Sequence, residues 1–116
     1  MYARELSKRL HTQGLHSIFV NSVHPGVVNS NMYRHSLFCK TPLRQLSAPF
    51  RWLFFKTARD GAQTSLYLAL SKEVDGISGK YFADCKLAKE SVHALNDQAC
   101  EDLYNYSQEQ CGVTDE

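Results

Sequence analysis

The 116-residue sequence lacks the spacings that identify metal sites and disulfide scaffolds. Its four cysteines are widely separated and form no C-x-x-C pair, and its five histidines form no H-E-x-x-H motif. The sequence therefore predicts four free thiols in a reducing compartment and no metal site. The cysteines are Cys39, Cys85, Cys100 and Cys111.

Long apolar runs and an excess of one charge are also missing. Thirteen basic and twelve acidic residues leave a formal net charge of +1, so we expect no nucleic-acid partner. The densest apolar stretch, PFRWLFF at residues 49–55, is far shorter than the roughly 18 residues that a spanning helix needs. The charged start, MYARELSKRL, has no apolar signal-peptide region.

The N-terminal quarter of the chain has the pattern of a helix followed by a strand. A helix is predicted over residues 2–13, and Gly14 lies where a left-handed C-cap belongs. No N-cap precedes it, so we expect it to be the end of a longer helix. The continuously apolar IFV within residues 16–23 predicts a strand that is covered on both faces.

The second half contains two more helices and one more strand. Thr57 and Asp60 predict a capping box that opens a helix over 57–71. After a turn at 75–79, KYFAD at 80–84 predicts a strand, and Asn96 is expected to cap a last helix. The predicted apolar stripe that faces the sheet consists of Ala62, Leu66, Ala69 and Leu70, and that of the last helix consists of Ala99, Leu103 and Tyr106.

These elements predict an α/β fold with two parallel neighbouring strands. They are joined by a long crossover whose segment 26–56 is predicted to be an irregular substrate-side loop or flap. Two strands do not make a stable sheet, so the architecture requires more strands than the pattern supplies.

The stretch VNSVHPGVVNS, residues 20–30, stops a strand at Pro25-Gly26. Taken alone, it indicates either an ordinary strand-ending turn or one edge of a ligand site. It resembles the segment that follows the sixth strand of short-chain dehydrogenases/reductases, where Pro-Gly is followed after three residues by Thr or Ser. TARDGAQTSLYLALS and DGISGKYFADCK look like the next helix and the seventh strand of the retinol dehydrogenase branch, in the same order.

The resemblance implies that the chain is the C-terminal part of a Rossmann-type, doubly wound parallel sheet. It would hold the last two strands and their flanking helices as one segment, 1–116, with the N-terminal half missing. The family's Gly-rich cofactor turn and catalytic Tyr-x-x-x-Lys pair have no counterpart here. Tyr2 does not start that pair, because the residue four later is Leu6. No catalytic residue is therefore expected in this chain.

The resemblance also implies a cofactor site and a reaction. Backbone groups after Pro-Gly bind the nicotinamide carboxamide in the family, so the implied cofactor-binding residues are Pro25, Gly26, Val27, Val28 and Ser30. The implied function is NADP(H)-dependent oxidoreduction of retinoids or other lipophilic alcohols and carbonyls. His24 is expected to be positional, and Cys85, which follows YFAD, to be a core thiol.

PFRWLFF has two interpretations: a helix packed on the domain, or a flap over an apolar substrate that touches a membrane surface. The second implies peripheral association on the cytoplasmic side of the endoplasmic reticulum. Its contact residues would be Phe50, Trp52, Phe54 and Phe55. The alternative function is a truncated, non-enzymatic product that pairs with a full-length subunit, and a homo-oligomer is also expected to be accessible.

Overall fold

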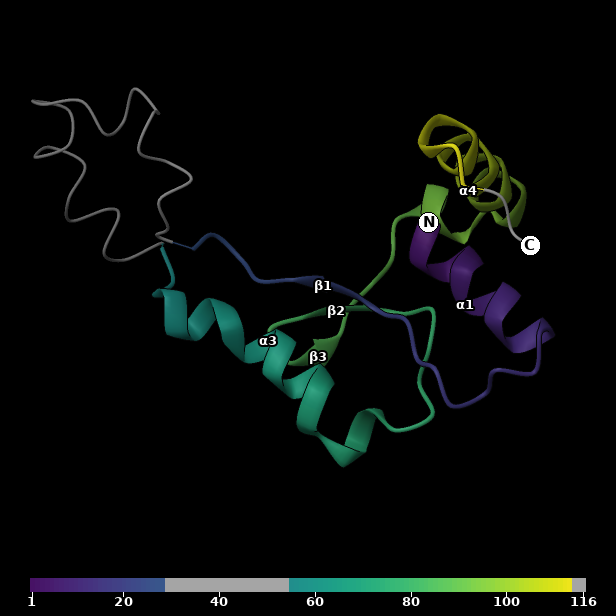
Figure 1. The fold of residues 1–116 in the computed structure, drawn as a ribbon. Coiled ribbons are helices and arrows are strands. Elements are labelled where there is room, and N and C mark those ends of the chain that lie inside the picture. The colour runs from purple at the N-terminus through teal and green to yellow at the C-terminus, as the bar shows by residue number, and fades with distance from the viewer. Residues whose placement is uncertain (29–54, 114–116) are drawn as a thin grey trace, which may run out of the picture.

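The computed structural model describes residues 1–28 and 55–113, which contain three α-helices and three short strands (Figure 1). The helices are α1 (Tyr2–Thr12), α3 (Ala58–Leu70) and α4 (Asp97–Cys111). The strands are β1 (Ser22–His24), β2 (Tyr81–Ala83) and β3 (Lys86–Leu87). Two single 3-10 turns, η3 (Lys72–Val74) and η4 (Val92–Leu95), precede β2 and α4 respectively.

The strands form one small mixed sheet in the order β1-β2-β3 (Figure 1). Strands β1 and β2 are parallel, with Val23 opposite Phe82, which confirms the predicted parallel pair. Strand β3 was not predicted, and it pairs antiparallel with β2. Asp84 and Cys85 join β2 to β3 with φ values of 51° and 56°, as in the two-residue turns that suit a hairpin.

The predicted strand over residues 16–23 is largely wrong, because only its last two residues belong to β1. Ile18 and Phe19 lie before the strand and are 44% and 43% exposed. Strand β2 begins only at Tyr81, so no described strand runs beside these residues. The backbone of Val20 is held by a turn instead: its N–H donates to Ser78 Oγ at 2.9 Å, and its carbonyl accepts from the Gly79 N–H at 2.7 Å.

Helix α1 ends as its sequence predicts. Gly14 has a φ of +79°, and its N–H donates to the His11 carbonyl at 3.1 Å. The Leu15 N–H reaches back to the Leu10 carbonyl at 2.9 Å. These two bonds form a Schellman motif, which satisfies carbonyls that the helix itself leaves without a donor.

Helix α3 begins with the predicted capping box. The Asp60 N–H donates to Thr57 Oγ1 at 3.1 Å, and the Thr57 N–H donates to Asp60 Oδ2 at 3.3 Å. Hydrogen bonds from Thr57 lower the pKa of the Asp60 carboxyl below its ordinary value. Both ends of this motif were identified from sequence because a capping box depends on residues only three apart.

The predicted inward face of α3 is wrong. Leu66 and Leu70 are 47% and 79% exposed, and Ala69 is exposed, whereas Gly61 and Thr64 are buried. The Thr64 hydroxyl accepts a hydrogen bond from the Cys85 N–H at 3.3 Å, which ties α3 to the β2–β3 turn. At Gly61 the Val28 side chain packs so closely that a Cβ would lie 2.4 Å from Val28 Cγ2, so this position of the inward face has no room for a side chain.

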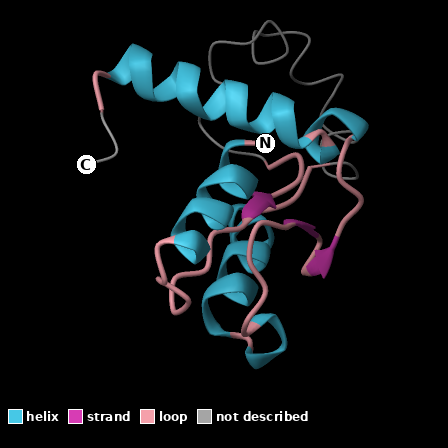
Figure 2. Cartoon of the chain, turned by 90° about the vertical axis from the view of Figure 1, so that its right-hand side faces the viewer, coloured by secondary structure: helices cyan, strands magenta, loops and turns pink. Residues whose placement is uncertain are grey.

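Helices α1 and α4 lie against one another at the other end of the molecule (Figures 1 and 2). Asn96 caps α4, with its side chain accepting from the Ala99 N–H, as predicted. The buried residues of α4 are Cys100 and Tyr104, so the predicted stripe of Ala99, Leu103 and Tyr106 does not form its inner face.

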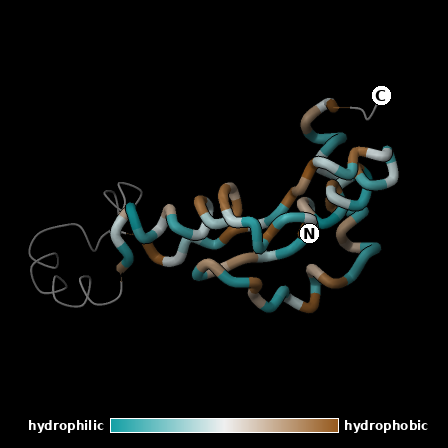
Figure 3. The backbone as a smooth tube through the Cα atoms, turned by 90° about the horizontal axis from the view of Figure 1, so that it is seen from below, coloured by the Kyte–Doolittle hydropathy of each residue, from teal (hydrophilic) through white to brown (hydrophobic). Residues whose placement is uncertain are grey.

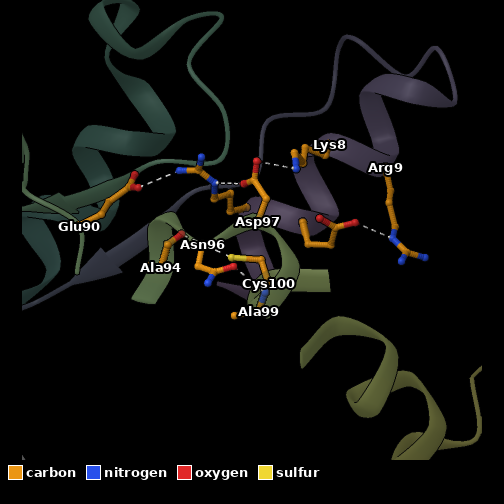
Figure 4. Close-up of polar contacts among 10 residues, drawn as sticks. Lys8, Arg9, Glu90, Ala94, Asn96, Asp97, Ala99 and Cys100 are labelled. Atoms are coloured by element: carbon orange, nitrogen blue, oxygen red, sulfur yellow. Dashed lines mark hydrogen bonds and ion pairs between the residues drawn. The ribbon is translucent and has the colours of Figure 1, made fainter. Parts of the chain in front are cut away.

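Aromatic and charged side chains join the two helices. The rings of Tyr2 and Tyr104 stack with centroids 4.8 Å apart, and the Arg9 guanidinium lies 4.2 Å from the Tyr104 ring centroid. Asp97 pairs with both Arg4 and Lys8 at 3.3 Å (Figure 4). Within α1, Glu5 and Arg9 lie four residues apart and form an ion pair at 3.1 Å.

The apolar residues that the structure describes do not form a single large hydrophobic core. Figure 3 shows hydrophobic positions spread along the whole tube. The buried apolar side chains among the described residues are Val74, Phe82, Cys100 and Tyr104. Phe82, which is 2% exposed, is the centre of the sheet, and the Tyr67 ring of α3 covers it at 6.4 Å between centroids.

Candidate functional site

The candidate site lies at the carboxyl ends of the two parallel strands. Pro25, Gly26, Val27 and Val28 follow β1, and Asp84 follows β2. Parallel strands end at the same edge of a sheet, and in open α/β folds this edge is where ligands bind. The structure therefore places the predicted Pro-Gly segment at the expected edge.

Gly26 is required by its backbone and by its neighbour. Its φ is +83°, a conformation that side chains other than glycine rarely adopt. A Cβ at this position would lie 3.1 Å from Lys56 Cδ and 3.2 Å from Lys56 Nζ. The lysine chain thus runs directly over the Gly26 backbone.

Val27 and Val28 are held through their backbone and packing. The Lys56 N–H donates to the Val27 carbonyl at 2.8 Å, and Val28 forms an isolated parallel bridge with Lys56. The Val28 side chain packs on α3 so closely that a Cβ on Gly61 would lie 2.4 Å from Val28 Cγ2. Among the described residues, no acceptor receives the N–H groups of Val27 and Val28.

An ion pair between Lys56 and Asp84 crosses this edge of the sheet. The Lys56 ammonium holds the pKa of the Asp84 carboxyl below its ordinary value, with small contributions from His24 and Lys86. Sequence reasoning missed both partners, which lie 28 residues apart. Their only sequence signal is that each lies next to a predicted element, Lys56 before a helix and Asp84 at the end of a strand.

The other predicted residues have mixed outcomes. Ser30, Phe50, Trp52 and Phe54 lie outside the described residues, as does most of the predicted flap over 26–56. Phe55 is half-buried. Cys85 is a half-buried free thiol in a hairpin turn and not a core residue, because the turn places it at the edge of the sheet.

The groups at this site are suited to binding and orienting a ligand, but few of them could transfer a proton. The Pro-Gly loop offers two backbone donors and an apolar valine surface. The Lys56–Asp84 ion pair lies beside it, with Lys56 before α3 and Asp84 in the β2–β3 turn. Within residues 1–28 and 55–113, no group of three potential metal ligands occurs, and no helix is long and apolar enough to cross a membrane.

Known proteins resemble this chain over almost its whole length. It is 46% identical over 114 residues to human retinol dehydrogenase 12, a match that covers 97% of this chain and 33% of that protein. It is 39% identical to mouse retinol dehydrogenase 14 over 113 residues, covering 97% and 33%. It is 36% identical to human dehydrogenase/reductase SDR family member 13 over 116 residues, covering 97% and 29%.

No family model and no solved structure matches the chain. The chain spans about one third of the length of the curated relatives that it matches. The matches cover the residues that carry the three sequence blocks. This chain is homologous to the C-terminal part of the short-chain dehydrogenases/reductases of the retinol dehydrogenase type.

Proposed function

We propose that this chain forms the nicotinamide-side and substrate-side part of an NADP(H)-dependent oxidoreductase. The substrates would be retinoids or other lipophilic alcohols and carbonyls. Two of the relatives are named retinol dehydrogenases, which supports an oxidoreductase and this substrate class. The preference for the phosphorylated cofactor rests on the family resemblance alone.

One observation carries the proposal. The N–H groups of Val27 and Val28 have no acceptor among the described residues, although the loop that bears them is fixed on both sides. Two adjacent backbone donors at the carboxyl edge of a parallel sheet suit a carboxamide oxygen. When bound, the cofactor supplies the hydride-transfer chemistry.

The residues of this chain would bind and orient the nicotinamide. Val27 and Val28 would donate to the carboxamide, and the Ser30 hydroxyl would add a third contact. Gly26 allows the backbone to turn, and the bond from the Lys56 N–H to the Val27 carbonyl holds the loop in place. Such positioning lowers the entropy cost of reaching the reactive geometry.

Proton transfer would need groups that this sequence does not contain. The family's Tyr-x-x-x-Lys pair and its Gly-rich turn are absent from the 116 residues. Losing general acid–base catalysis alone typically lowers a rate by about 10² to 10⁴. We therefore expect no dehydrogenase activity from this chain by itself, and cofactor-dependent oxidation of retinol by the purified chain would contradict this.

A chimera tests the cofactor site. This chain replaces the matching third of human retinol dehydrogenase 12, and NADPH affinity is measured by fluorescence titration together with reduction of retinal. Gly26→Ala is expected to weaken NADPH binding by about tenfold or more, since it strains the loop that carries the donors. Titration with NADH in parallel tests the cofactor preference.

Gly76→Ala is the matched control, because Gly76 also has a positive φ, of 76°, but has open space around it. Both variants carry the same kind of backbone strain, and only Gly26 lies in the candidate site. A Gly26→Ala chimera that binds NADPH as tightly as the Gly76→Ala chimera would refute the proposed site.

Peripheral membrane contact is part of the same proposal. Phe55 precedes Lys56 directly, so the PFRWLFF segment leads into the candidate site. Aromatic side chains favour the membrane–water interface, where a lipophilic substrate would be taken up. We therefore propose that the chain works on the cytoplasmic side of the endoplasmic reticulum membrane, which vesicle flotation with and without Trp52→Ala can test.

A non-enzymatic pairing role is the second candidate function. Strand β1 is an edge of the described sheet, and Ile18 and Phe19 are exposed in the segment just before it. An open strand edge with exposed apolar side chains favours pairing with another chain, either a second copy or a full-length subunit. Sedimentation of the purified chain tests this, and a stable, concentration-independent monomer would argue against it.

A further inference from the structure

Two histidine rings lie in contact, edge to face, at the C-terminal end of α1 and outside the candidate cofactor site. The Nδ1 atoms of His11 and His16 lie 3.2 Å apart. Their ring centroids are 4.7 Å apart, and the ring planes are inclined by 74°. Both side chains are exposed to solvent, so neither is needed to fill the core.

The backbone between the two histidines is fixed. His11 lies in the last turn of α1, and its carbonyl accepts from the Gly14 N–H in the Schellman motif. The Leu15 N–H closes the same motif, one residue before His16. The two rings therefore extend from a structured turn, which reduces the conformational entropy lost when both bind one ligand.

The nitrogen separation suits one metal ion. Zn²⁺ binds histidine nitrogen at about 2.0–2.1 Å, and at tetrahedral angles two such ligands lie about 3.3 Å apart. The observed 3.2 Å agrees with that separation. Without a metal, the same contact requires one Nδ1 to carry a proton and the other to accept it.

The surrounding charges do not oppose a cation. The C-terminal end of a helix carries a partial negative charge that favours positive ions. The nearest basic residues on the same helix are already paired with carboxylates, Lys8 with Asp97 at 3.3 Å and Arg9 with Glu5 at 3.1 Å. In the part of the chain that the structure describes, no third histidine, cysteine or carboxylate completes a three-ligand group, so water would fill the remaining positions.

We propose that His11 and His16 form a two-imidazole site for a divalent transition-metal ion of the Zn²⁺, Ni²⁺ and Cu²⁺ class. Imidazole nitrogens suit these ions, and carboxylate-preferring ions such as Mg²⁺ and Ca²⁺ would not bind. The bound ion cross-links the last turn of α1 to the chain that follows it. This site does not depend on the proposed oxidoreductase function, because it uses neither the Pro-Gly loop nor any cofactor.

The test uses the full 116-residue chain and Ni²⁺, which is paramagnetic and avoids the strong thiol preference of Cu(I) and Zn²⁺. Isothermal titration measures the affinity, and histidine side-chain nitrogen resonances report which rings bind. We expect saturable binding of one ion, with the His11 and His16 resonances broadened together. His11→Ala or His16→Ala is expected to weaken binding about tenfold or more, because each removes one of two cooperating ligands.

His93→Ala is the matched control, since His93 is another exposed histidine and lies on η4. It should leave the affinity unchanged. The proposal is overturned if Ni²⁺ broadens only one of the two rings, if binding is not saturable, or if His93→Ala weakens it as much as His16→Ala. The resonance measurement on the unaltered chain keeps the proposal testable even if a variant folds poorly.

Discussion

The helix pair α1–α4 and the unit of α3 with the sheet are stabilised in different ways. The helix pair combines a stacked Tyr2–Tyr104 pair, a cation over the Tyr104 ring and the ion pairs of Asp97 (Figure 4). The sheet unit depends on one almost fully buried aromatic residue, Phe82. It leaves apolar residues such as Leu66 and Leu70 exposed on α3.

The difference shows in which region the side chains find packing partners among the described residues. In the helix pair, polar and aromatic partners lie within the chain, and Tyr104 is 3% exposed. Around the sheet, the apolar faces of α3 and of the segment before β1 have no cover from the described residues. Exposed apolar surface of this kind marks a place for further contacts. The candidate cofactor loop lies in the sheet unit, where the described residues leave these apolar faces exposed.

The largest expected effect comes from Phe82→Ala in the sheet unit. Replacing a buried phenylalanine by alanine typically lowers the free energy of unfolding by about 4 kcal/mol. This would remove much of a typical stability of about 5–15 kcal/mol. Denaturant unfolding followed by circular dichroism measures it. Phe82→Leu is the milder companion, and equal stability of all three proteins would contradict a sheet centred on Phe82.

Tyr104→Ala probes the helix pair and should lower the free energy of unfolding by about 3 kcal/mol. It removes the ring that stacks on Tyr2 and lies under Arg9. Tyr106→Ala is the control, because Tyr106 is on the same helix and 61% exposed. It should change stability by less than about 0.5 kcal/mol. A larger effect at Tyr106 than at Tyr104 would reverse the assigned inner face of α4.

Gly61→Ala tests the contact between α3 and the Pro-Gly loop. Alanine normally favours a helix by about 1 kcal/mol over glycine. Here its Cβ would meet Val28 Cγ2 at 2.4 Å, so we expect a net loss of about 2 kcal/mol instead.

Val28→Ala should relieve that clash, so a double-mutant cycle isolates the contact. The pair Gly61→Ala with Val28→Ala is expected to be more stable than the sum of the single effects predicts. Purely additive effects in thermal or denaturant unfolding would show that the two residues do not touch.

The smallest effect concerns pH and the ion pairs of Asp97. Lys8, and to a lesser extent Arg4, hold the pKa of Asp97 below its ordinary value of 3.8. A carboxyl with a lowered folded-state pKa stabilises the fold above its ordinary pKa, and this contribution is lost as the pH falls through the folded value. As the pH falls below about 4, the free energy of unfolding of Asp97→Asn should therefore decrease less than that of the unaltered chain.

Salt provides a second test of the same ion pairs. Their contribution should weaken in high salt, because Asp97 and Lys8 are exposed. Asp75→Asn, in the turn after η3, is the control and should follow the unaltered chain. In the pH experiment, if the stability of Asp97→Asn falls with acid just as that of the unaltered chain does, these ion pairs do not stabilise the helix pair.

Local features of the fold were predictable from sequence. The Schellman glycine at Gly14, the capping box of Thr57 and Asp60, and the Asn96 cap all depend on residues within a few positions of each other. Backbone geometry and short-range hydrogen bonds decide such motifs. The parallel pairing of β1 and β2 was also predictable, because a long crossover between two strands favours it.

The candidate site was predictable only in part. The Pro-Gly segment was found because its backbone pattern is local and because it resembles a known family. Lys56, Asp84 and Gly61 were missed, since each gains its role only when distant parts of the chain meet. Helical spacing likewise could not choose between Leu66 and Thr64 as the inner face of α3.

The sequence by itself determined the ends of the helices, the position of the Pro-Gly turn and the kinship with the dehydrogenases. Those features depend on φ preferences and hydrogen bonds between residues close in the chain. Only the tertiary structure decided which faces are buried, how short β1 is and which charges meet at the edge of the sheet. Burial and ion pairing depend on which neighbour is present, and an apolar residue such as Ile18 stays exposed where none of the described residues covers it.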